Sequence, residues 1–486
     1  MRGNELLNIC TDSRDAASDR GIAMILLGAG LLGYGALAWF FRVVTPDGFT
    51  YIELAENLFR GGYVVMGEPY AKFLPFYPFL MALFNLAAGG AIGVEKWGQA
   101  VSVGCGAMLP PLLFLLARRL QASRWAALTA AAALALMAVG WDQYRDVNVM
   151  PIFTLLLLLS YWLLSTERFF TAGLMLGLAM ITRYEGYLLV LVFVIANLGS
   201  GRAVIKGLAG TALAASPWLI RNLLTYGTLS RTSYWLELVV LHLHLAEIGL
   251  GLVKDFGPVA LAAAALGLAR LQRKWLIYLA GFAALYTGLH VIWWWYQDRF
   301  LLALMPAVLA PAALGLDRFV KWDASRRPER EPRMKTAAAA GVLVPLLAVS
   351  GLYLYGLAAL PGDPILEAAK SLRQVPGEEA VLGQNPLIFK YTTGREAYTW
   401  GEIKPGDDPD RFVLEQVLTH DVGLIVWLNI SQVDWQRFGF LKSAKNRDTV
   451  VTTPQGKFRL TYLFLRAFNR DGRIALVYRV MAASIE

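Results

Sequence analysis

The chain has 486 residues, of which 57% are hydrophobic and 17% charged, with a formal net charge of +9 at pH 7. Soluble domains are about 25% charged, so this composition indicates a membrane protein and excludes disordered, collagen-like and disulfide-stapled chains. The positive charge does not indicate nucleic-acid binding, because Lys and Arg gather in short segments between apolar runs.

The apolar runs predict many membrane-spanning helices, each of which needs about 20 mostly apolar residues. They lie at roughly 21–43, 96–117, 124–141, 147–166, 169–182, 186–199, 203–220, 256–270, 275–296, 300–320 and 336–360. A further stretch, 74–88, is broken by Pro75 and Pro78, and we interpret it as interfacial or re-entrant. The sequence therefore predicts an all-α polytopic membrane protein with about 11 transmembrane helices.

Lys and Arg predict the orientation, because cytoplasmic loops carry an excess of them. With a cytoplasmic N-terminus, the segment before the last span lies inside the cell. Its positive residues are Arg318, Lys321, Arg326, Arg327, Arg330, Arg333 and Lys335. The first outer loop is then 44–95, and residues 361–486 lie on the extracytoplasmic side. We expect the first span to be retained, because its apolar run continues beyond a sequence that resembles a processing site.

Residues 361–486 have the composition of a soluble domain. Short apolar runs at 380–382 and 422–428 predict buried strands, and 364–373 and 409–419 read as helices. Two further strands, 459–468 and 473–480, flank the turn sequence Asn-Arg-Asp-Gly and predict a hairpin. We expect a small extracytoplasmic α/β domain that covers the site or docks the acceptor.

The first outer loop begins with Asp47, followed by apolar residues at helical spacing. These residues are Phe49, Ile52, Leu54, Ala55 and Leu58. They predict an amphipathic helix along the membrane interface. At the start of that helix, Asp47 is placed either to cap it or to act on a substrate.

Arg183, Arg221 and Arg299 each end an apolar span on this same predicted side. Convergent arginines at that depth suit a lipid phosphate, because a guanidinium offers it two parallel hydrogen bonds. The alternative is interfacial anchoring, since long cationic side chains snorkel to the headgroup layer. Other polar residues predicted here are Glu68, Lys72, Asp142, Arg145, Asp146, Tyr184, Glu185 and Asp298.

Seven short motifs follow one another on this side of the membrane. In chain order they are Asp-Gly-Phe-Thr-Tyr at 47–51, Pro-Phe-Tyr-Pro at 75–78, Tyr-Arg-Asp-Val at 144–147, Ile-Thr-Arg-Tyr-Glu-Gly at 181–186, Pro-Trp-Leu-Ile-Arg-Asn at 217–222, Asp-Arg-Phe-Leu-Leu at 298–302 and Tyr-Thr-Thr-Gly-Arg-Glu-Ala at 391–397. This order resembles that of the GT-C glycosyltransferases, in the bacterial branch similar to protein O-mannosyltransferases and the lipid A aminoarabinose transferase.

The resemblance implies a transmembrane GT-C catalytic domain over 1–360, with interfacial helices in the loop 44–95, and a periplasmic domain over 361–486. It implies a multi-pass enzyme of the bacterial inner (cytoplasmic) membrane. Such an enzyme transfers a sugar, with inversion, from a polyprenyl-phosphate (undecaprenyl-phosphate) donor to a lipid, glycan or protein acceptor on the outer face.

The resemblance also assigns roles to individual residues. Asp47 would be the general base or substrate-orienting carboxylate, and Asp146 a second catalytic acid. The donor phosphate would contact Lys72, Arg183, Arg221 and Arg299. Candidates for the substrate cavity are Tyr51, Glu68, Tyr184, Glu185, His242 and Asp298.

The sequence departs from the family pattern at three places. Gly48 replaces the Glu of the protein mannosyltransferases, and Val149-Met150-Pro151 has no acid before its proline. Lys72 lies nearest to the acidic position that helps to hold a metal in the aminoarabinose branch, so no cofactor is required and a divalent metal is an alternative. His242 and His244 do not strengthen that alternative, because residues two apart lie on different helix faces.

Two other functions are compatible with such a chain. One is a non-catalytic GT-C-like member, and the other is a polytopic lipid or sugar transporter. Transporters place ionisable groups near the midplane of the bilayer and often repeat their halves. Here the charges gather on one face and no internal repeat is visible, which favours the enzyme.

Overall fold

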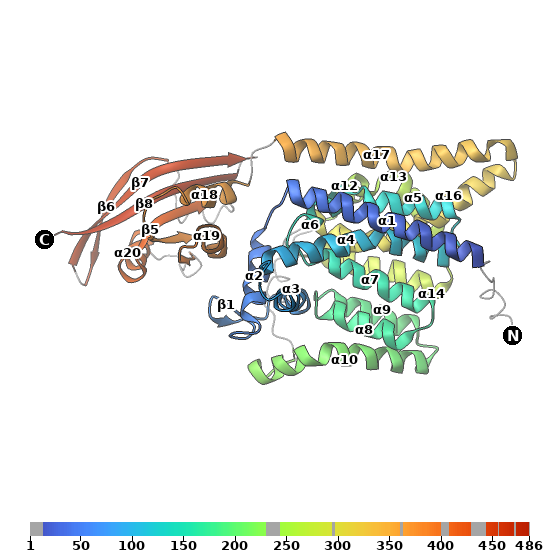
Figure 1. Cartoon of the computed structure of the whole chain (residues 1–486), viewed down its shortest axis with the longest axis horizontal. Helices are drawn as coiled ribbons and strands as arrows, with labels where there is room; N and C mark the ends of the chain where they lie inside the picture. Colours follow the sequence, from blue (N-terminus) through green and yellow to red (C-terminus); the bar gives the residue numbers. More distant parts are fainter. Residues whose placement is uncertain are drawn as a thin grey trace. The chain divides into compact units, whose positions relative to one another are not determined.

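The computed structural model describes residues 13–229, 244–293, 297–359, 363–399, 408–428, 444–454, 456–470 and 473–485. The chain divides into two compact units, Met1–Leu357 and Ala358–Glu486. Figure 1 shows that the first unit is helical and that the second is built around a sheet.

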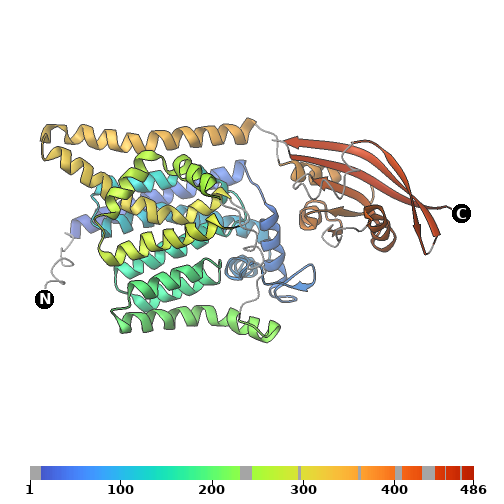
Figure 2. The ribbon, with the colours of Figure 1, turned by 180° about the vertical axis from the view of Figure 1, so that it is seen from behind.

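The longer helices of the first unit run in roughly the same direction (Figures 1 and 2), and shorter helices accompany them. They are α1 (Ser13–Phe40), α2 (Pro46–Asn57), α3 (Phe76–Ala87), α4 (Val94–Arg119), α5 (Arg124–Ala135), α6 (Ala138–Tyr144), α7 (Met150–Ser165), α8 (Phe169–Met180), α9 (Gly186–Ala196), α10 (Gly201–Tyr226), α12 (Leu245–Phe256), α13 (Pro258–Leu268), α14 (Arg273–Leu276), the π-helix η1 (Ile277–Gly281), α15 (Phe282–Val291), the 3₁₀-helices η2 (Asp298–Leu304) and η3 (Pro328–Arg330), α16 (Met305–Ala324) and α17 (Glu331–Ala359).

Small residues allow some of these helices to approach closely. A Cβ added to Gly173 of α8 would lie 2.0 Å from the carbonyl oxygen of Gly207 in α10. Lipid-facing helices gain little from burying apolar surface against each other, so close backbone contact is the usual way to hold them together.

Among the described residues, five helical stretches are long and apolar enough to cross a membrane. Two bent pairs, α5 with α6 at 56° and α12 with α13 at 96°, raise the number to seven if each pair counts as one span. The chain is therefore a mostly helical, multi-span membrane protein, while the expected number of about 11 spans is confirmed only in part. The predicted spans 147–166, 169–182 and 186–199 correspond to α7, α8 and α9, which are apolar helices of only 10–17 residues.

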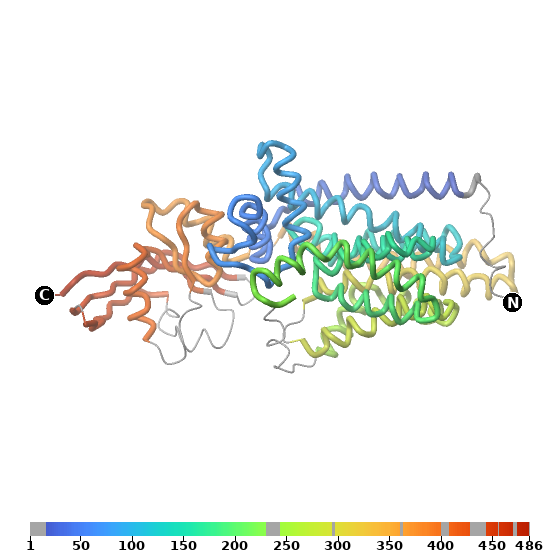
Figure 3. Tube along the Cα trace, turned by 90° about the horizontal axis from the view of Figure 1, so that it is seen from below, coloured from blue at the N-terminus to red at the C-terminus, as the bar shows by residue number. Residues whose placement is uncertain are grey.

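One end of the bundle carries most of the predicted site, and we call it the α2 end. Here α2 and α3 lie across the ends of the longer helices, with the small ribbon of β1 (Val64–Val65) and β2 (Glu68–Pro69) beside them (Figures 1 and 3). The two prolines at 75 and 78 fall at the start of α3, where a missing N–H breaks no helical hydrogen bond. Both short helices pack against α4.

The second unit has a six-stranded mixed sheet in the order β4-β3-β5-β8-β7-β6. Its elements are α18 (Pro364–Leu372), β3 (Ala380–Gly383), α19 (Pro386–Thr393), β4 (Ala397–Tyr398), α20 (Pro409–His420), β5 (Val422–Leu428), β6 (Arg447–Thr453), β7 (Gly456–Arg470) and β8 (Arg473–Ile485). Strand β3 runs parallel to β4 and β5, and the other pairs are antiparallel. The predicted strands, helices and hairpin are confirmed, with Arg470 paired to Arg473 next to the turn.

Candidate functional site

Asp47 lies in the first turn of α2 and faces a cation from a distant segment. The helix is capped by Thr45, whose hydroxyl oxygen accepts a hydrogen bond from the Gly48 N–H at 3.3 Å. The Asp47 carboxylate instead lies 2.7 Å from Nη1 of Arg299, at the start of η2. Their side chains are 35% and 22% exposed, so the pair sits at the edge of the packed bundle. The interpretation of Asp47 as only a helix cap is therefore wrong.

Asp146 lies behind the start of α2, in the segment between α6 and α7, and is 2% exposed. Its Oδ1 accepts a hydrogen bond from the backbone N–H of Thr45 at 3.1 Å, and its Oδ2 accepts one from the Thr45 hydroxyl at 2.8 Å. Burial raises the pKa of Asp146 to about 6, although the hydrogen bonds from Thr45 oppose the rise. This carboxyl thus holds the residue that caps α2.

Gly48 allows the first turn of α2 to approach the segment that carries Asp146. A Cβ at this position would lie 3.0 Å from Cγ1 of Val44 and 3.1 Å from the carbonyl oxygen of Val147. A larger residue here would require these neighbours to move by a few tenths of an ångström, which favours glycine over the acidic residue of the protein mannosyltransferases.

Arg183 and Glu185 form a buried ion pair between α8 and α9. Nε of Arg183 lies 3.2 Å from both carboxylate oxygens of Glu185, and Nε2 of His290 lies 3.6 Å from Oε1. Burial alone would raise the pKa of Glu185, but Arg183 and His290 outweigh it and hold the pKa well below its usual value. Glu185 is thereby kept ionised.

Phe300 connects the two arginines of the site. Its ring centre lies 5.6 Å from the guanidinium carbon of Arg183 and 5.7 Å from that of Arg299, distances that suit cation–π contact. The ring also packs on His290, with centroids 4.3 Å apart. Sequence reasoning assigned no role to His290 or Phe300. The signal that could have found His290 is an ionisable residue inside an apolar segment.

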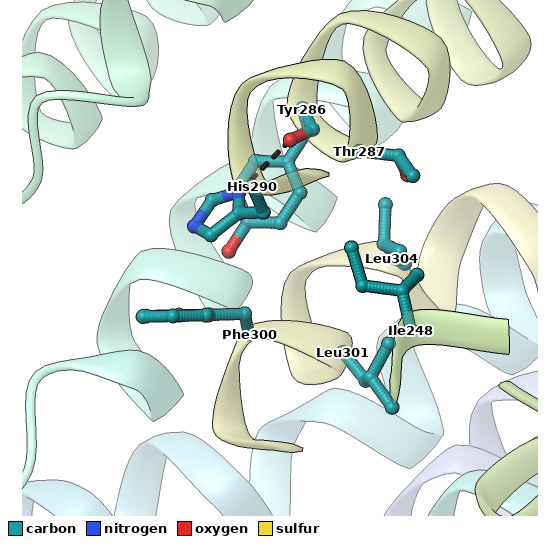
Figure 4. A pocket seen from close by; sticks show the side chains of 7 residues that line it. All are labelled: Ile248, Tyr286, Thr287, His290, Phe300, Leu301 and Leu304. Carbon is teal, nitrogen blue, oxygen red and sulfur yellow. Dashed lines mark hydrogen bonds between the residues drawn. The ribbon is translucent and has the colours of Figure 1, made fainter. Parts of the chain in front are cut away.

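A small pocket opens beside this cluster, lined by Ile248, Tyr286, Thr287, His290, Phe300, Leu301 and Leu304. Figure 4 shows Phe300 near the His290 ring, whose Nδ1 is 2.8 Å from the carbonyl oxygen of Tyr286. The leucine and isoleucine side chains form the other wall (Figure 4). The lining is mostly apolar.

Tyr51 lies one helical turn beyond Asp47 and is 5% exposed. Its ring stacks on Phe73 at 4.8 Å and meets the edge of Tyr77 at 5.1 Å. Burial raises the pKa of Tyr51, Asp47 raises it further, and the nearby Arg183 and Arg299 oppose the rise.

Two acids, two arginines and a tyrosine from the predicted set therefore meet in one cluster at the α2 end, which we call the Asp47 cluster. Its members are Asp47, Tyr51, Arg183, Glu185 and Arg299.

Other predicted residues lie near this end but have different neighbours. Arg221 donates hydrogen bonds to the carbonyl oxygens of Tyr63 at 3.3 Å and Tyr70 at 3.4 Å, and its guanidinium lies over three aromatic rings. The Tyr184 hydroxyl donates to the carbonyl oxygen of Ala71 at 2.7 Å, next to the half-buried Lys72. Both contacts hold the first loop against the bundle.

The remaining predictions divide among different places. Asp298 pairs with Lys254 at 2.5 Å, and Glu68 is exposed on β2. His242 lies outside the described residues. Within the described ranges, no three His, Cys, Asp or Glu residues gather as metal ligands would. The residues present do not fit a divalent cation, because such an ion takes several oxygen ligands and no such group gathers among the described residues.

No family model and no curated protein sequence matches this chain. Solved structures do resemble it. The ArnT protein of Cupriavidus metallidurans in the apo state superposes with a TM-score of 0.60 and 13% identity, covering 95% of this chain and 98% of that one. The same protein bound to undecaprenyl phosphate gives 0.58 and 14%, covering 94% and 98%.

A more distant resemblance is to the oligosaccharyltransferase of Archaeoglobus fulgidus, with a TM-score of 0.53, 12% identity and coverage of 83% and 68%. At such identities the likeness concerns the fold. The chain therefore has the fold of the GT-C glycosyltransferases, the group to which both of these proteins belong.

Proposed function

We propose that this chain is a glycosyltransferase of the bacterial cytoplasmic membrane. It would take a sugar from a polyprenyl-phosphate donor and transfer it, with inversion, to a lipid, glycan or protein acceptor on the extracytoplasmic face. The observation that carries the proposal is the meeting of Asp47 with Arg299, because a carboxylate that could act as a base lies beside a guanidinium, a group that suits a phosphate. The fold supports it, since the similar ArnT protein binds undecaprenyl phosphate.

In this reaction Asp47 would take the proton from the acceptor hydroxyl as its oxygen attacks the anomeric carbon. The bond between that carbon and the phosphate oxygen breaks, and the departing phosphate keeps the electron pair. Arg299 would stabilise the charge that grows on the phosphate. Its Nε is buried and has no acceptor among the described residues, so the guanidinium still has a donor to offer.

The other charged residues would support this pair. Arg183 is bound by Glu185, so its charge would act on the phosphate mainly through space. Asp146 would position the start of α2, because both of its oxygens are occupied by Thr45. Arg221 would hold the first loop over the site, because it bonds the carbonyl oxygens of Tyr63 and Tyr70, and Lys72 of the same loop would contact the phosphate when the donor enters.

The test compares the lipids and glycans of a deletion strain with those of strains that carry variants. Wild-type protein should restore a sugar-bearing product detectable by mass spectrometry, and Asp47→Asn should leave the deletion pattern. The matched control is Glu329→Gln, an exposed acid in η3 away from the α2 end. Full restoration by Asp47→Asn at equal protein level would remove Asp47 from the mechanism. Uptake of a sugar or lipid by proteoliposomes, without transfer, would favour a transporter.

A further inference from the structure

Arg299 is held loosely in comparison with Arg183. It contacts Asp47 through Nη1 at 2.7 Å, while its buried Nε has no acceptor among the described residues. Arg183 places Nε and Nη2 on Glu185, which also lies 3.6 Å from His290. The side chains of Arg183 and Glu185 are 17% and 10% exposed, against 22% and 35% for Arg299 and Asp47. The more exposed pair can separate without leaving a deeply buried charge unpaired.

The charges around this pair are balanced. Asp47 and Glu185 carry two negative charges, and Arg183 and Arg299 carry two positive ones. A phosphodiester that enters adds one negative charge, and a guanidinium matches two phosphate oxygens better than one carboxylate oxygen. The incoming phosphate and Asp47 therefore compete for the same cation.

We propose that the donor phosphate takes Arg299 away from Asp47, and that this exchange is what makes Asp47 available as the base. The inference rests on the proposed function and adds an order of events to it. While Asp47 is paired with Arg299, its Oδ2 lies 2.7 Å from Nη1, so this oxygen is occupied by the guanidinium and not open to the acceptor hydroxyl. Once the phosphate holds Arg299, Asp47 can accept the hydroxyl proton of the acceptor. The site thus has an active base only when the donor is present.

If the donor phosphate and Asp47 compete for Arg299, then Asp47 should weaken the binding of the phosphate. If Asp47 only supported the site, its removal would not strengthen that binding. Removing the negative charge of Asp47 leaves Arg299 without a competing anion. Asp47→Asn should therefore bind a polyprenyl phosphate more tightly than the wild type, by roughly fivefold to tenfold, although it cannot complete transfer. Arg299→Gln should weaken binding by about tenfold or more. In the double variant the gain from Asp47→Asn should vanish, because it acts through Arg299.

The experiment measures the binding of undecaprenyl phosphate, which carries no sugar, to the full-length protein in nanodiscs. The proteins are the wild type, Asp47→Asn, Arg299→Gln, the double variant and the control Glu329→Gln, each checked by its melting temperature. Arg299→Lys is included in case Arg299→Gln does not fold. It keeps the charge but loses the paired donors, so its binding should fall between those of wild type and Arg299→Gln.

Each outcome separates the exchange from the function on which it rests. Tighter binding by Asp47→Asn that disappears in the double variant supports the exchange. Equal or weaker binding by Asp47→Asn, with weaker binding by the Arg299 variants, overturns the exchange and leaves the proposed function intact. A gain that persists in the double variant shows general charge repulsion and also overturns the exchange. If the wild type and Asp47→Asn both fail to bind undecaprenyl phosphate, the proposed function itself fails.

Discussion

Asp146 and Thr45 are far apart in the sequence, yet the acid accepts two hydrogen bonds from this one residue. The motif at 144–147 places Asp146 on the predicted face but says nothing about its neighbours. Its partner follows from the packing of the segment before α2 against the segment before α7. The end of the bundle at which Asp146 lies was therefore predictable from the sequence, while its hydrogen-bond partner was not.

The titration of Asp146 gives a test of this arrangement. Its pKa rises to about 6 from the usual 3.8, because burial favours the neutral carboxyl. A group whose pKa is raised by folding stabilises the protein below its unfolded pKa and loses that contribution as pH rises through the folded one. The wild type should therefore lose stability relative to Asp146→Asn between about pH 4 and pH 6, because the amide does not titrate.

Melting temperatures of the two purified proteins at pH 4.5, 6 and 7.5 check this expectation. Glu329→Gln, which changes an exposed acid in η3, is measured alongside as the control. A constant difference between wild type and Asp146→Asn would contradict a raised pKa at this position.

The contact between Asp47 and Arg299 was likewise not predictable from the sequence. Sequence reasoning could place both at one end of the bundle, from the span pattern and the positive charges of the loops. It could not foresee that Arg299 contacts Asp47 while Arg221 contacts the carbonyl oxygens of the first loop. Both arginines stand at the end of an apolar segment, so the sequence does not distinguish them. The distinction arises from which helix ends meet.

At the scale of elements, α2 shows what periodicity does and does not predict. The apolar spacing predicted a helix close to the observed Pro46–Asn57. It also predicted a helix lying along the membrane interface, yet residues on several sides of α2 are buried, including Glu53, which accepts a hydrogen bond from the Met66 N–H at 3.0 Å. Packing against α3 and α4 is a tertiary feature that the pattern of one helix does not contain.

Helix α12 shows the opposite case. The predicted span at 256–270 corresponds to α13, while α12 precedes it at a bend of 96°. Glu247, Lys254 and Asp255 interrupt the apolar run of α12, so a search for continuous apolar residues stops before it. The number of spans predicted from the sequence therefore differs from the observed number mainly where helices are short or bent.

The close contact at Gly48 gives a prediction for α2 as a unit. In Gly48→Ala the new methyl group would press on Val44 and on the backbone of Val147, so we expect a small displacement of α2 that loosens the contact of Asp47 with Arg299. We expect a loss of about 1–3 kcal/mol in stability, typical of overpacking, together with loss of most of the activity. Melting temperature and the product assay in the deletion strain measure both effects.

The matched control is Gly61→Ala, which lies in the same outer loop with nothing within 4 Å of the added Cβ. It should change neither quantity appreciably. If Gly48→Ala behaves like Gly61→Ala, then the position of α2 tolerates a shift and the geometry of the Asp47 cluster is less constrained than these contacts indicate.

At the scale of the whole molecule, the charges separate between the two ends of the bundle. The α2 end holds the Asp47 cluster, where each cation has an anionic partner. At the other end, Asp19 of α1 accepts hydrogen bonds from Arg118 and Arg124 at 2.9 Å and 2.6 Å. The segment that joins α16 to α17, with the helix ends beside it, carries the largest group of positive residues, two of which, Lys321 and Lys335, pair with Asp317 and Glu331.

This separation predicts the orientation in the membrane. Cytoplasmic loops carry the excess of Lys and Arg, so the segment between α16 and α17 should lie inside and the α2 end outside. Alkaline phosphatase fused after residue 486 should be active, because that enzyme folds outside the cytoplasm, while green fluorescent protein exported unfolded to the same position should stay dark. Fusions placed at Arg327, in the positive segment, should give the reverse pattern.

The orientation bears directly on the chemistry. Sugar nucleotides are made in the cytoplasm, so a site at the outer face needs a sugar that is already activated on a lipid, and a lipid phosphate is the group that the Asp47 cluster would bind. An inactive phosphatase at residue 486 together with a bright fluorescent fusion would place the α2 end in the cytoplasm. A nucleotide-linked donor would then be accessible to the site, and the reason for a polyprenyl-phosphate donor would be lost.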